Sequence, residues 1–170
     1  MFTASIDPSV PKRDLYRDLV ASLKSLLDGE TDALANLSNA AGLVNQALDG
    51  INWCGFYLLR GEELVLGPFQ GKPACVRIPL GKGVCGTAAA RRETIVVPDV
   101  REFPGHIACD ADSRSEIVVP ILTAGRLVGV LDVDAPETGR FDEEDRRGLE
   151  RFVNALVPMV AWETVTGEVR

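Results

Sequence analysis

The amino-acid sequence predicts an α+β fold with a largely antiparallel sheet. Apolar residues recur with helical spacing mainly near the two ends of the chain. Between these ends lie short runs of aromatic and β-branched residues, separated by glycine-containing turns. The predicted order is two helices, two strands, a strand and a helix, three strands, and a last helix. No repeat or long linker interrupts the 170 residues, so we expect a single domain spanning residues 1–170.

The first third of the chain predicts two amphipathic helices. Pro11 can open the first, because its missing N–H is unpaired at a helix start anyway, and Gly29 ends it. Gly50 ends the second helix. Each helix has an apolar stripe with spacings of three and four, formed by Leu15, Leu19, Leu23 and Leu26 in the first and by Leu34, Leu37, Ala41, Val44 and Leu48 in the second.

The middle of the chain predicts a hairpin, a short strand, a glycine-led helix and a buried strand that stops at Pro98. These are residues 51–60 with 63–69, then 76–79, 80–93 and 94–100. The segment from Phe103 to Ser115 contains thirteen residues without a helix or strand pattern. A loop of this length inside a compact domain is usually functional or disordered.

A second hairpin and a long helix complete the pattern. The hairpin has a three-residue turn, 123–125, in which Leu122 pairs with Arg126. Asp142 is a good N-cap for the last helix, which Pro158 should kink. The buried face of this helix consists of Leu149, Phe152, Val153, Leu156 and Val160.

Three acidic residues gather at one end of this second hairpin. The predicted register places Glu116 opposite Asp132, and alternation puts Asp134 and Val128 on the same face. Opposed like charges destabilise a sheet, so such a cluster needs a reason: it can hold an ammonium group or keep one carboxyl protonated as an acid. The alternative is a solvated strand end, and a bulge at Pro120 would change the register.

The composition argues against several classes of partner. The net charge of −7 disfavours nucleic acid and anionic lipid surfaces. We find no apolar run of about 20 residues and no signal peptide, so we expect a cytoplasmic protein without a membrane span.

Four cysteines provide the reactive groups. Cys54 reads as a small core residue. Cys85 lies in the first turn of the glycine-led helix, where backbone N–H groups lower a thiol pKa, so it is the activated nucleophile on this physics alone. Cys75 and Cys109 lie in loops, where two thiols can approach and exchange a disulfide. With no C-x-x-C pair and His106 as the one histidine, the spacing does not indicate a metal site.

Trp53 and Tyr57 are four residues apart on a predicted strand, so they share one face. They can wall a pocket for a small apolar or sulfur-bearing group, or they can simply be core.

Several motifs between Ile51 and Phe141 together carry a family resemblance: NWCGFYLL, LGPFQGKPAC, RIPLGKGVCGTAA, VVPDV, FPGHIACD, SRSEIVVPI and GVLDVD. The sequence resembles the free methionine-R-sulfoxide reductases. The resemblance implies a GAF fold, with a central antiparallel six-stranded sheet and the N- and C-terminal helices packed on one side. It further implies free methionine sulfoxide and a thioredoxin-like reductant as partners, and neither metal nor organic cofactor. GAF domains often dimerise through terminal helices, which leaves a homodimer open.

The resemblance also assigns roles to the thiols. Cys109 would attack the sulfoxide sulfur and become a sulfenic acid, Cys75 would condense with it to a disulfide, and Cys85 would be a third thiol able to act as a secondary resolver. This choice of nucleophile has a physical reason. Protonating the oxygen helps sulfoxide reduction, and Cys109 lies seven residues before Glu116.

The remaining roles concern substrate binding. The resemblance implies that Glu116 and Asp134 bind and polarise the sulfoxide oxygen, that Asp132 holds the substrate ammonium, and that Trp53 and Tyr57 frame the methyl-sulfur end. Two other functions stay open from the sequence. One is a GAF sensor that binds a small ligand, such as a cyclic nucleotide, without chemistry. The other is a redox switch in which a disulfide alters a partner surface.

Overall fold

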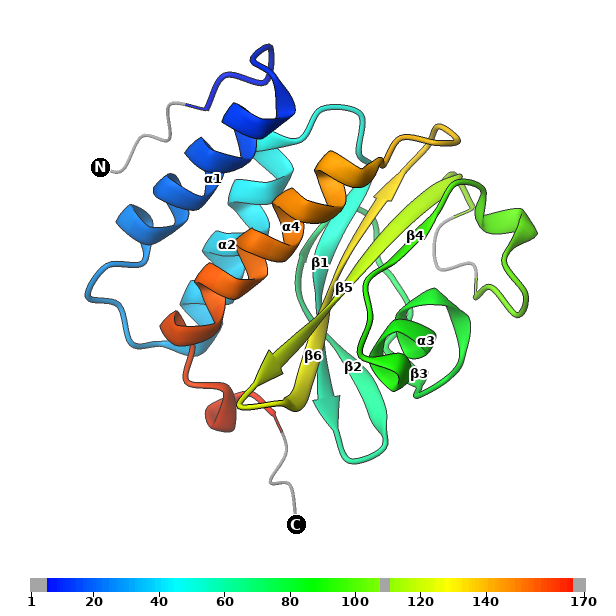
Figure 1. Cartoon of the computed structure of the whole chain (residues 1–170). Helices are drawn as coiled ribbons and strands as arrows, with labels where there is room; N and C mark the ends of the chain where they lie inside the picture. The colour runs from blue at the N-terminus through cyan, green and yellow to red at the C-terminus, as the bar shows by residue number, and fades with distance from the viewer. Residues whose placement is uncertain (1–5, 108–110, 167–170) are drawn as a thin grey trace.

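The computed structural model describes residues 6–107 and 111–166. These residues form a six-stranded antiparallel sheet in the order β3-β2-β1-β6-β5-β4 (Figure 1). The strands are β1 Trp53–Arg60, β2 Glu63–Gln70, β3 Arg77–Pro79, β4 Ile95–Val97, β5 Ser115–Thr123 and β6 Arg126–Ala135. The helices are α1 Lys12–Leu26, α2 Ala33–Ala47, α3 Gly83–Arg91 and α4 Glu143–Leu156, with short 3-10 turns at Val100–Glu102, Val157–Met159 and Trp162–Thr164.

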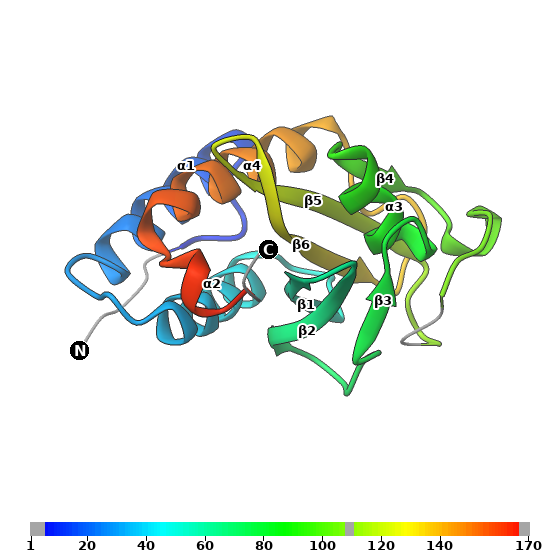
Figure 2. The ribbon, with the colours of Figure 1, turned by 90° about the horizontal axis from the view of Figure 1, so that it is seen from below.

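The sheet separates two apolar clusters. The larger one joins α1, α2 and α4 to one face of the sheet, and the smaller one joins α3 to the other face (Figure 2). The prediction that the N- and C-terminal helices pack on one side is therefore confirmed. Among the described residues, no helix has the length and apolar character of a membrane span.

Three details of the predicted elements are wrong. Leu34 is exposed, because α2 begins at Ala33 and turns its first leucine toward solvent. The helix α4 ends at Leu156 instead of bending at Pro158, since this proline lies inside the 3-10 turn Val157–Met159, which leads Val160 into the core. The strand β4 is only partly buried, because it pairs with β5 alone and forms an edge of the sheet.

The register of the second hairpin also differs from the prediction. The turn has two residues, Ala124 and Gly125, both with positive φ, and Thr123 pairs with Arg126. A bulge then follows, so that Ile121 pairs with Gly129. The shorter turn and the bulge each shift the pairing by one residue, and together they shift it by two.

A shift of two residues preserves the face, because side chains alternate with a period of two. The three acids therefore still share one side of the sheet, although Glu116 lies opposite Asp134 and not opposite Asp132. Val128 is the exception. It lies at the bulge and packs into the larger cluster, on the face covered by α1, α2 and α4. Its predicted position beside the acids is therefore wrong.

Candidate functional site

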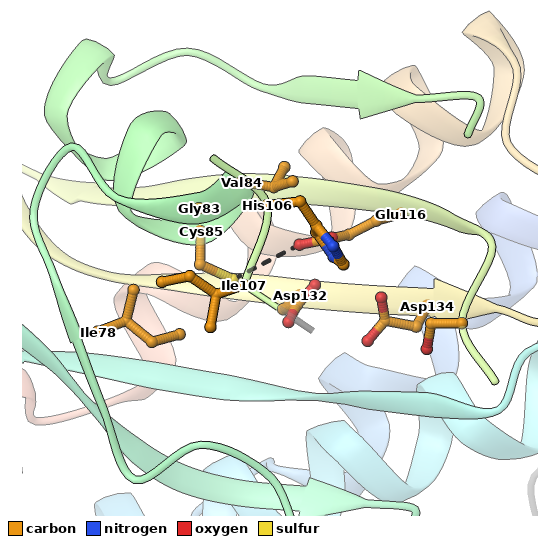
Figure 3. Close-up of a pocket in the computed structure, with 10 residues that line it drawn as sticks. Ile78, Gly83, Val84, Cys85, His106, Ile107, Glu116, Asp132 and Asp134 are labelled. Atoms are coloured by element: carbon orange, nitrogen blue, oxygen red, sulfur yellow. Dashed lines mark hydrogen bonds and ion pairs between the residues drawn. The ribbon is translucent and has the colours of Figure 1, made fainter. Parts of the chain in front are cut away.

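A small cavity lies between the start of α3, the segment that follows the first 3-10 turn, and the ends of β5 and β6 (Figure 3). Its volume is about 30 Å³, room for a few water molecules at most. The residues lining it combine acids, a thiol, an imidazole and apolar side chains: Ile78, Gly83, Val84, Cys85, His106, Ile107, Ser113, Glu116, Asp132 and Asp134.

Pairing of β5 with β6 builds the acidic wall of this cavity. Glu116 pairs with Asp134, and Asp132 is the partner of Val118 one step further along the same face. Glu116 and Asp132 are each only 6% exposed, whereas Asp134 is half-buried. The sequence-based grouping of the three acids is thus found in the structure, and its alternative, a fully solvated strand end, does not describe Glu116 or Asp132.

Burial changes the protonation of these acids. It raises the pKa of Glu116 well above its usual range, and the nearby charges of Asp132 and Asp134 raise it further. Burial also raises the pKa of Asp132 to about 7. These shifts favour a protonated carboxyl group in the cavity near neutral pH, which can serve as a proton source. One oxygen of Asp132, Oδ1, is buried and accepts no hydrogen bond from the described residues.

Cys85 reaches the acids from α3. Gly81 and Gly83 precede it with positive φ, a conformation that favours glycine, and they shape the turn that starts the helix. The Cys85 thiol donates a long hydrogen bond to Glu116, with 3.8 Å between Sγ and Oε1. The packing of α3 on β3 is close, since a Cβ on Gly86 would lie 2.3 Å from the carbonyl oxygen of Pro79.

The expectation of an activated thiol at Cys85 is wrong. Burial raises its pKa well above 9.0, and the charges of Asp132 and Glu116 add to the effect. These carboxyl groups come from other strands, so they outweigh the backbone N–H groups at the helix start. In space, Cys85 also lies beside Glu116, the acid whose closeness in sequence favoured Cys109 as the nucleophile.

The other cysteines occupy different environments. Cys54 is fully buried, as predicted. It lies on the face covered by α1, α2 and α4, and its thiol donates to the carbonyl oxygen of Ala41. Cys75 is disulfide-bonded and packs at the edge of the apolar cluster beneath α3. Cys109 lies outside the described residues, so its predicted position beside Glu116 stays a prediction.

Trp53 and Tyr57 share one face, as predicted, and their stacked rings lie 5.9 Å apart between centroids. A second stack joins Trp53 to Phe69 at 5.4 Å. The polar groups of Trp53 and Tyr57 bind the segment that follows β2. The Trp53 indole N–H donates to the carbonyl oxygen of Lys72, and the Tyr57 hydroxyl donates to that of Cys75. Neither ring lines the cavity; both belong to the apolar cluster under it.

His106 lines the cavity, although the sequence analysis noted it only as the one histidine of the chain. Its Nε2 lies 3.8 Å from Oε2 of Glu116, within ion-pair range but too far for a hydrogen bond. Burial lowers the pKa of this imidazole, so it is neutral at pH 7 and faces a carboxyl group without forming a salt bridge. The available signal in the sequence was that His106 is the one histidine of the chain and shares its loop with Asp110 and Asp112.

Comparisons with known proteins identify the family of the chain. The GAF domain model matches residues 14–157. The free methionine-R-sulfoxide reductase of Escherichia coli is 51% identical over 150 residues, which cover 88% of this chain and 91% of that protein. The protein of the same name from Saccharomyces cerevisiae is 46% identical over 153 residues and 85% of each chain.

A solved structure extends the likeness to three dimensions. The X-ray structure of free methionine-R-sulfoxide reductase from Neisseria meningitidis in complex with its substrate matches with a TM-score of 0.91 and 43% identity. The match covers 97% of this chain and 99% of that one. The chain therefore belongs to the GAF-domain family of free methionine-R-sulfoxide reductases.

Proposed function

We propose that this protein reduces the free R epimer of methionine sulfoxide to methionine with its own thiols. The observation that carries the proposal is the buried acid cluster, in which burial raises the pKa of both Glu116 and Asp132. Sulfoxide oxygen is a poor leaving group until it is protonated, and a closed cavity with a protonated carboxyl provides the proton. The family membership supports the same activity, because relatives named for it match along nearly the whole chain.

The reaction transfers oxygen and two electrons between sulfur atoms. The Cys109 thiolate attacks the sulfoxide sulfur while Glu116 protonates the oxygen, assisted by Asp134. The protonated oxygen then passes as hydroxyl to the Cys109 sulfur while the new bond between Cys109 and the substrate sulfur breaks. Methionine leaves with that electron pair, and Cys109 becomes a sulfenic acid. The Cys75 thiol displaces water from this sulfenic acid, which forms the Cys75–Cys109 disulfide. A thioredoxin-like dithiol then reduces the disulfide by exchange, so the cycle suits a reducing compartment such as the cytoplasm.

Asp132 is suited to bind the substrate ammonium. Its unpartnered Oδ1 offers a buried acceptor, and a bound ammonium would hold the carboxylate in its charged form. A substrate inside a peptide lacks the free ammonium, which gives a reason for preferring the free amino acid. Trp53 and Tyr57 do not line the cavity, so they would frame the methyl-sulfur end only once the cavity widens toward them. Cys85 lies beside Glu116 and would act as a secondary resolving thiol.

The cavity is smaller than the proposed substrate, so binding requires neighbouring side chains to move. Ile107 lines the cavity and is 37% exposed, which makes it the apolar side chain best placed to swing outward. Its contact with Gly83 is close, because a Cβ on that glycine would lie 3.2 Å from the Ile107 side chain. Substrate entry would therefore separate Ile107 from the start of α3.

The test is turnover of the two sulfoxide epimers with dithiothreitol or a thioredoxin system as the reductant. We expect consumption of the free R epimer only, with no turnover of N-acetylated substrate. Cys109→Ser should abolish activity, whereas Cys75→Ser should impair recycling by thioredoxin. Cys54→Ala is the matched control, because this thiol lies on the far face of the sheet. Equal, slow reaction of both epimers, or ligand binding without turnover, would favour a redox switch or a sensor instead.

A further inference from the structure

The cavity holds a donor set that the sequence spacing did not indicate. Cys85, Glu116 and Asp132 each offer one ligand atom, and these atoms all lie within 4.8 Å of one another. They come from α3, β5 and β6, so distant parts of the chain provide them. Figure 3 shows the three side chains converging on one spot, with His106 beside Glu116.

We propose that this cavity is a binding site for a borderline divalent cation such as Zn²⁺, held by Cys85, Glu116 and Asp132. A thiolate with carboxylates and an imidazole is a donor set typical of zinc, whereas calcium and magnesium prefer oxygen alone. Bond lengths of about 2.0–2.3 Å place tetrahedral ligand atoms roughly 3.3–3.8 Å apart. The 3.8 Å between Sγ of Cys85 and Oε1 of Glu116 already falls at this spacing.

A second observation points independently to a cation. Asp132 lines the cavity, and its Oδ1 is buried and accepts no hydrogen bond from the described part of the chain. A buried carboxylate oxygen without a donor is costly unless a positive charge or a donor occupies the space in front of it. A cation there would satisfy this oxygen and would also neutralise the repulsion between Asp132 and Glu116.

His106 lies beside this donor set and could approach as a fourth ligand. Its Nε2 is 3.8 Å from Oε2 of Glu116, and an imidazole nitrogen is a common zinc ligand. Binding of the cation converts the Cys85 thiol to a thiolate and removes the proton held by the carboxyl groups. Metal uptake at neutral pH should therefore release protons into an unbuffered solution.

The site overlaps the one proposed for the substrate, so the cation should act as an inhibitor. This consequence rests on the proposed function, because the cation would take the place of the substrate ammonium at Asp132. It would also occupy the carboxyl groups that donate the proton. Binding and inhibition are therefore measured separately.

The binding test uses Co²⁺ as a spectroscopic probe for the zinc site. The full-length chain carries Cys75→Ser and Cys109→Ser, which leaves two thiols and no turnover. We expect one equivalent of Co²⁺ to give a thiolate charge-transfer band. Adding Cys85→Ser should abolish this band, and adding Asp132→Asn should weaken binding at least tenfold. Adding Cys54→Ala, the matched control, should leave the band in place. A missing band, or a band that survives Cys85→Ser, would overturn the proposal.

The inhibition test uses the wild-type enzyme with Zn²⁺ and free methionine-R-sulfoxide. We expect competitive inhibition, with KM raised, kcat unchanged and full reversal by a chelator. Inhibition that more substrate cannot overcome would contradict a shared site. Because the Co²⁺ titration involves no turnover, a positive titration supports the cation site even where the reductase assay fails.

Discussion

The Sγ atom of Cys85 lies 3.8 Å from Oε1 of Glu116, and this contact joins the start of α3 to the acidic ends of β5 and β6. The helix start favours a thiolate, whereas the buried acids favour a thiol. The acids dominate, because burial and the two carboxyl groups raise the pKa of Cys85 well above 9.0. The same contact has consequences for reactivity, for stability and for metal binding.

Cys85 should react slowly with alkylating reagents in the folded protein. In a background of Cys54→Ala, Cys75→Ser and Cys109→Ser, we expect iodoacetamide to modify it at least about tenfold more slowly at pH 7.5 than in urea, since only the thiolate reacts. Adding Asp132→Asn should speed the reaction by removing a nearby negative charge, although the thiol stays buried. Rates by mass spectrometry would decide. A native rate above the unfolded one would mean that the helix start controls this thiol.

The stability of the protein should fall as the pH rises toward neutrality. Because the pKa of Asp132 rises from 3.8 in the unfolded chain to about 7, the folded state binds the extra proton between these values. Asp132→Asn removes this penalty, so its gain relative to wild type should grow from pH 4 to pH 8, by up to roughly 4 kcal/mol. Urea unfolding at both pH values measures the gain. An equal effect of the exposed control Glu62→Gln, or no change with pH, would contradict the assignment.

Gly55 should resist substitution because two aromatic residues cover it. A Cβ there would lie 2.4 Å from Cβ of Phe69 and 2.8 Å from the ring of Trp53. We expect Gly55→Ala to destabilise the fold by about 1–3 kcal/mol and to raise KM by displacing Trp53. Gly42→Ala is the control. Its site in α2 is open, so the change should stabilise the helix by up to about 1 kcal/mol. Thermal unfolding measures the stability of both variants, and steady-state kinetics measures their KM. Equal stability and equal KM in Gly55→Ala and Gly42→Ala would contradict this prediction.

Tyr57 should help to position Cys75 for disulfide formation. Its hydroxyl donates to the carbonyl oxygen of Cys75 at 3.0 Å. Tyr57→Phe should cost about 1 kcal/mol of stability and prolong the life of the Cys109 sulfenic acid, which a dimedone-trapping time course measures. Tyr16→Phe is the matched control, because it loses a hydrogen bond to Asp145 on the opposite face. Equal sulfenic acid lifetimes in both variants would leave Tyr57 with a structural role only.

Local patterns were sufficient to predict most of the fold. Helical spacing located the terminal helices, and runs of β-branched and aromatic residues located the strands, because these signals depend on neighbours in sequence. The bulge in the second hairpin was harder to place. It depends on how Ile121 and Gly129 meet across two strands, which the alternation of one strand does not reveal.

The acidic face was predictable for a simple reason. Side chains alternate along a strand, so every second residue lies on the same side of the sheet. A register shift of two residues leaves that side unchanged, and Glu116, Asp132 and Asp134 therefore stay together. The protonation of the site was not predictable in this way. It depends on burial and on the approach of α3, and both arise only when the chain folds.

The sequence by itself determined the α+β class, the order of the elements, the shared face of the acids and the family to which the motifs belong. Only the tertiary structure decided that Cys85 is a protonated thiol beside Glu116, that His106 borders the same cavity, and that Asp132 holds an unsatisfied oxygen. The physical reason is that helical spacing and the alternation of side chains along a strand depend on residues close in sequence. Desolvation and charge coupling, in contrast, depend on contacts between residues distant in the chain.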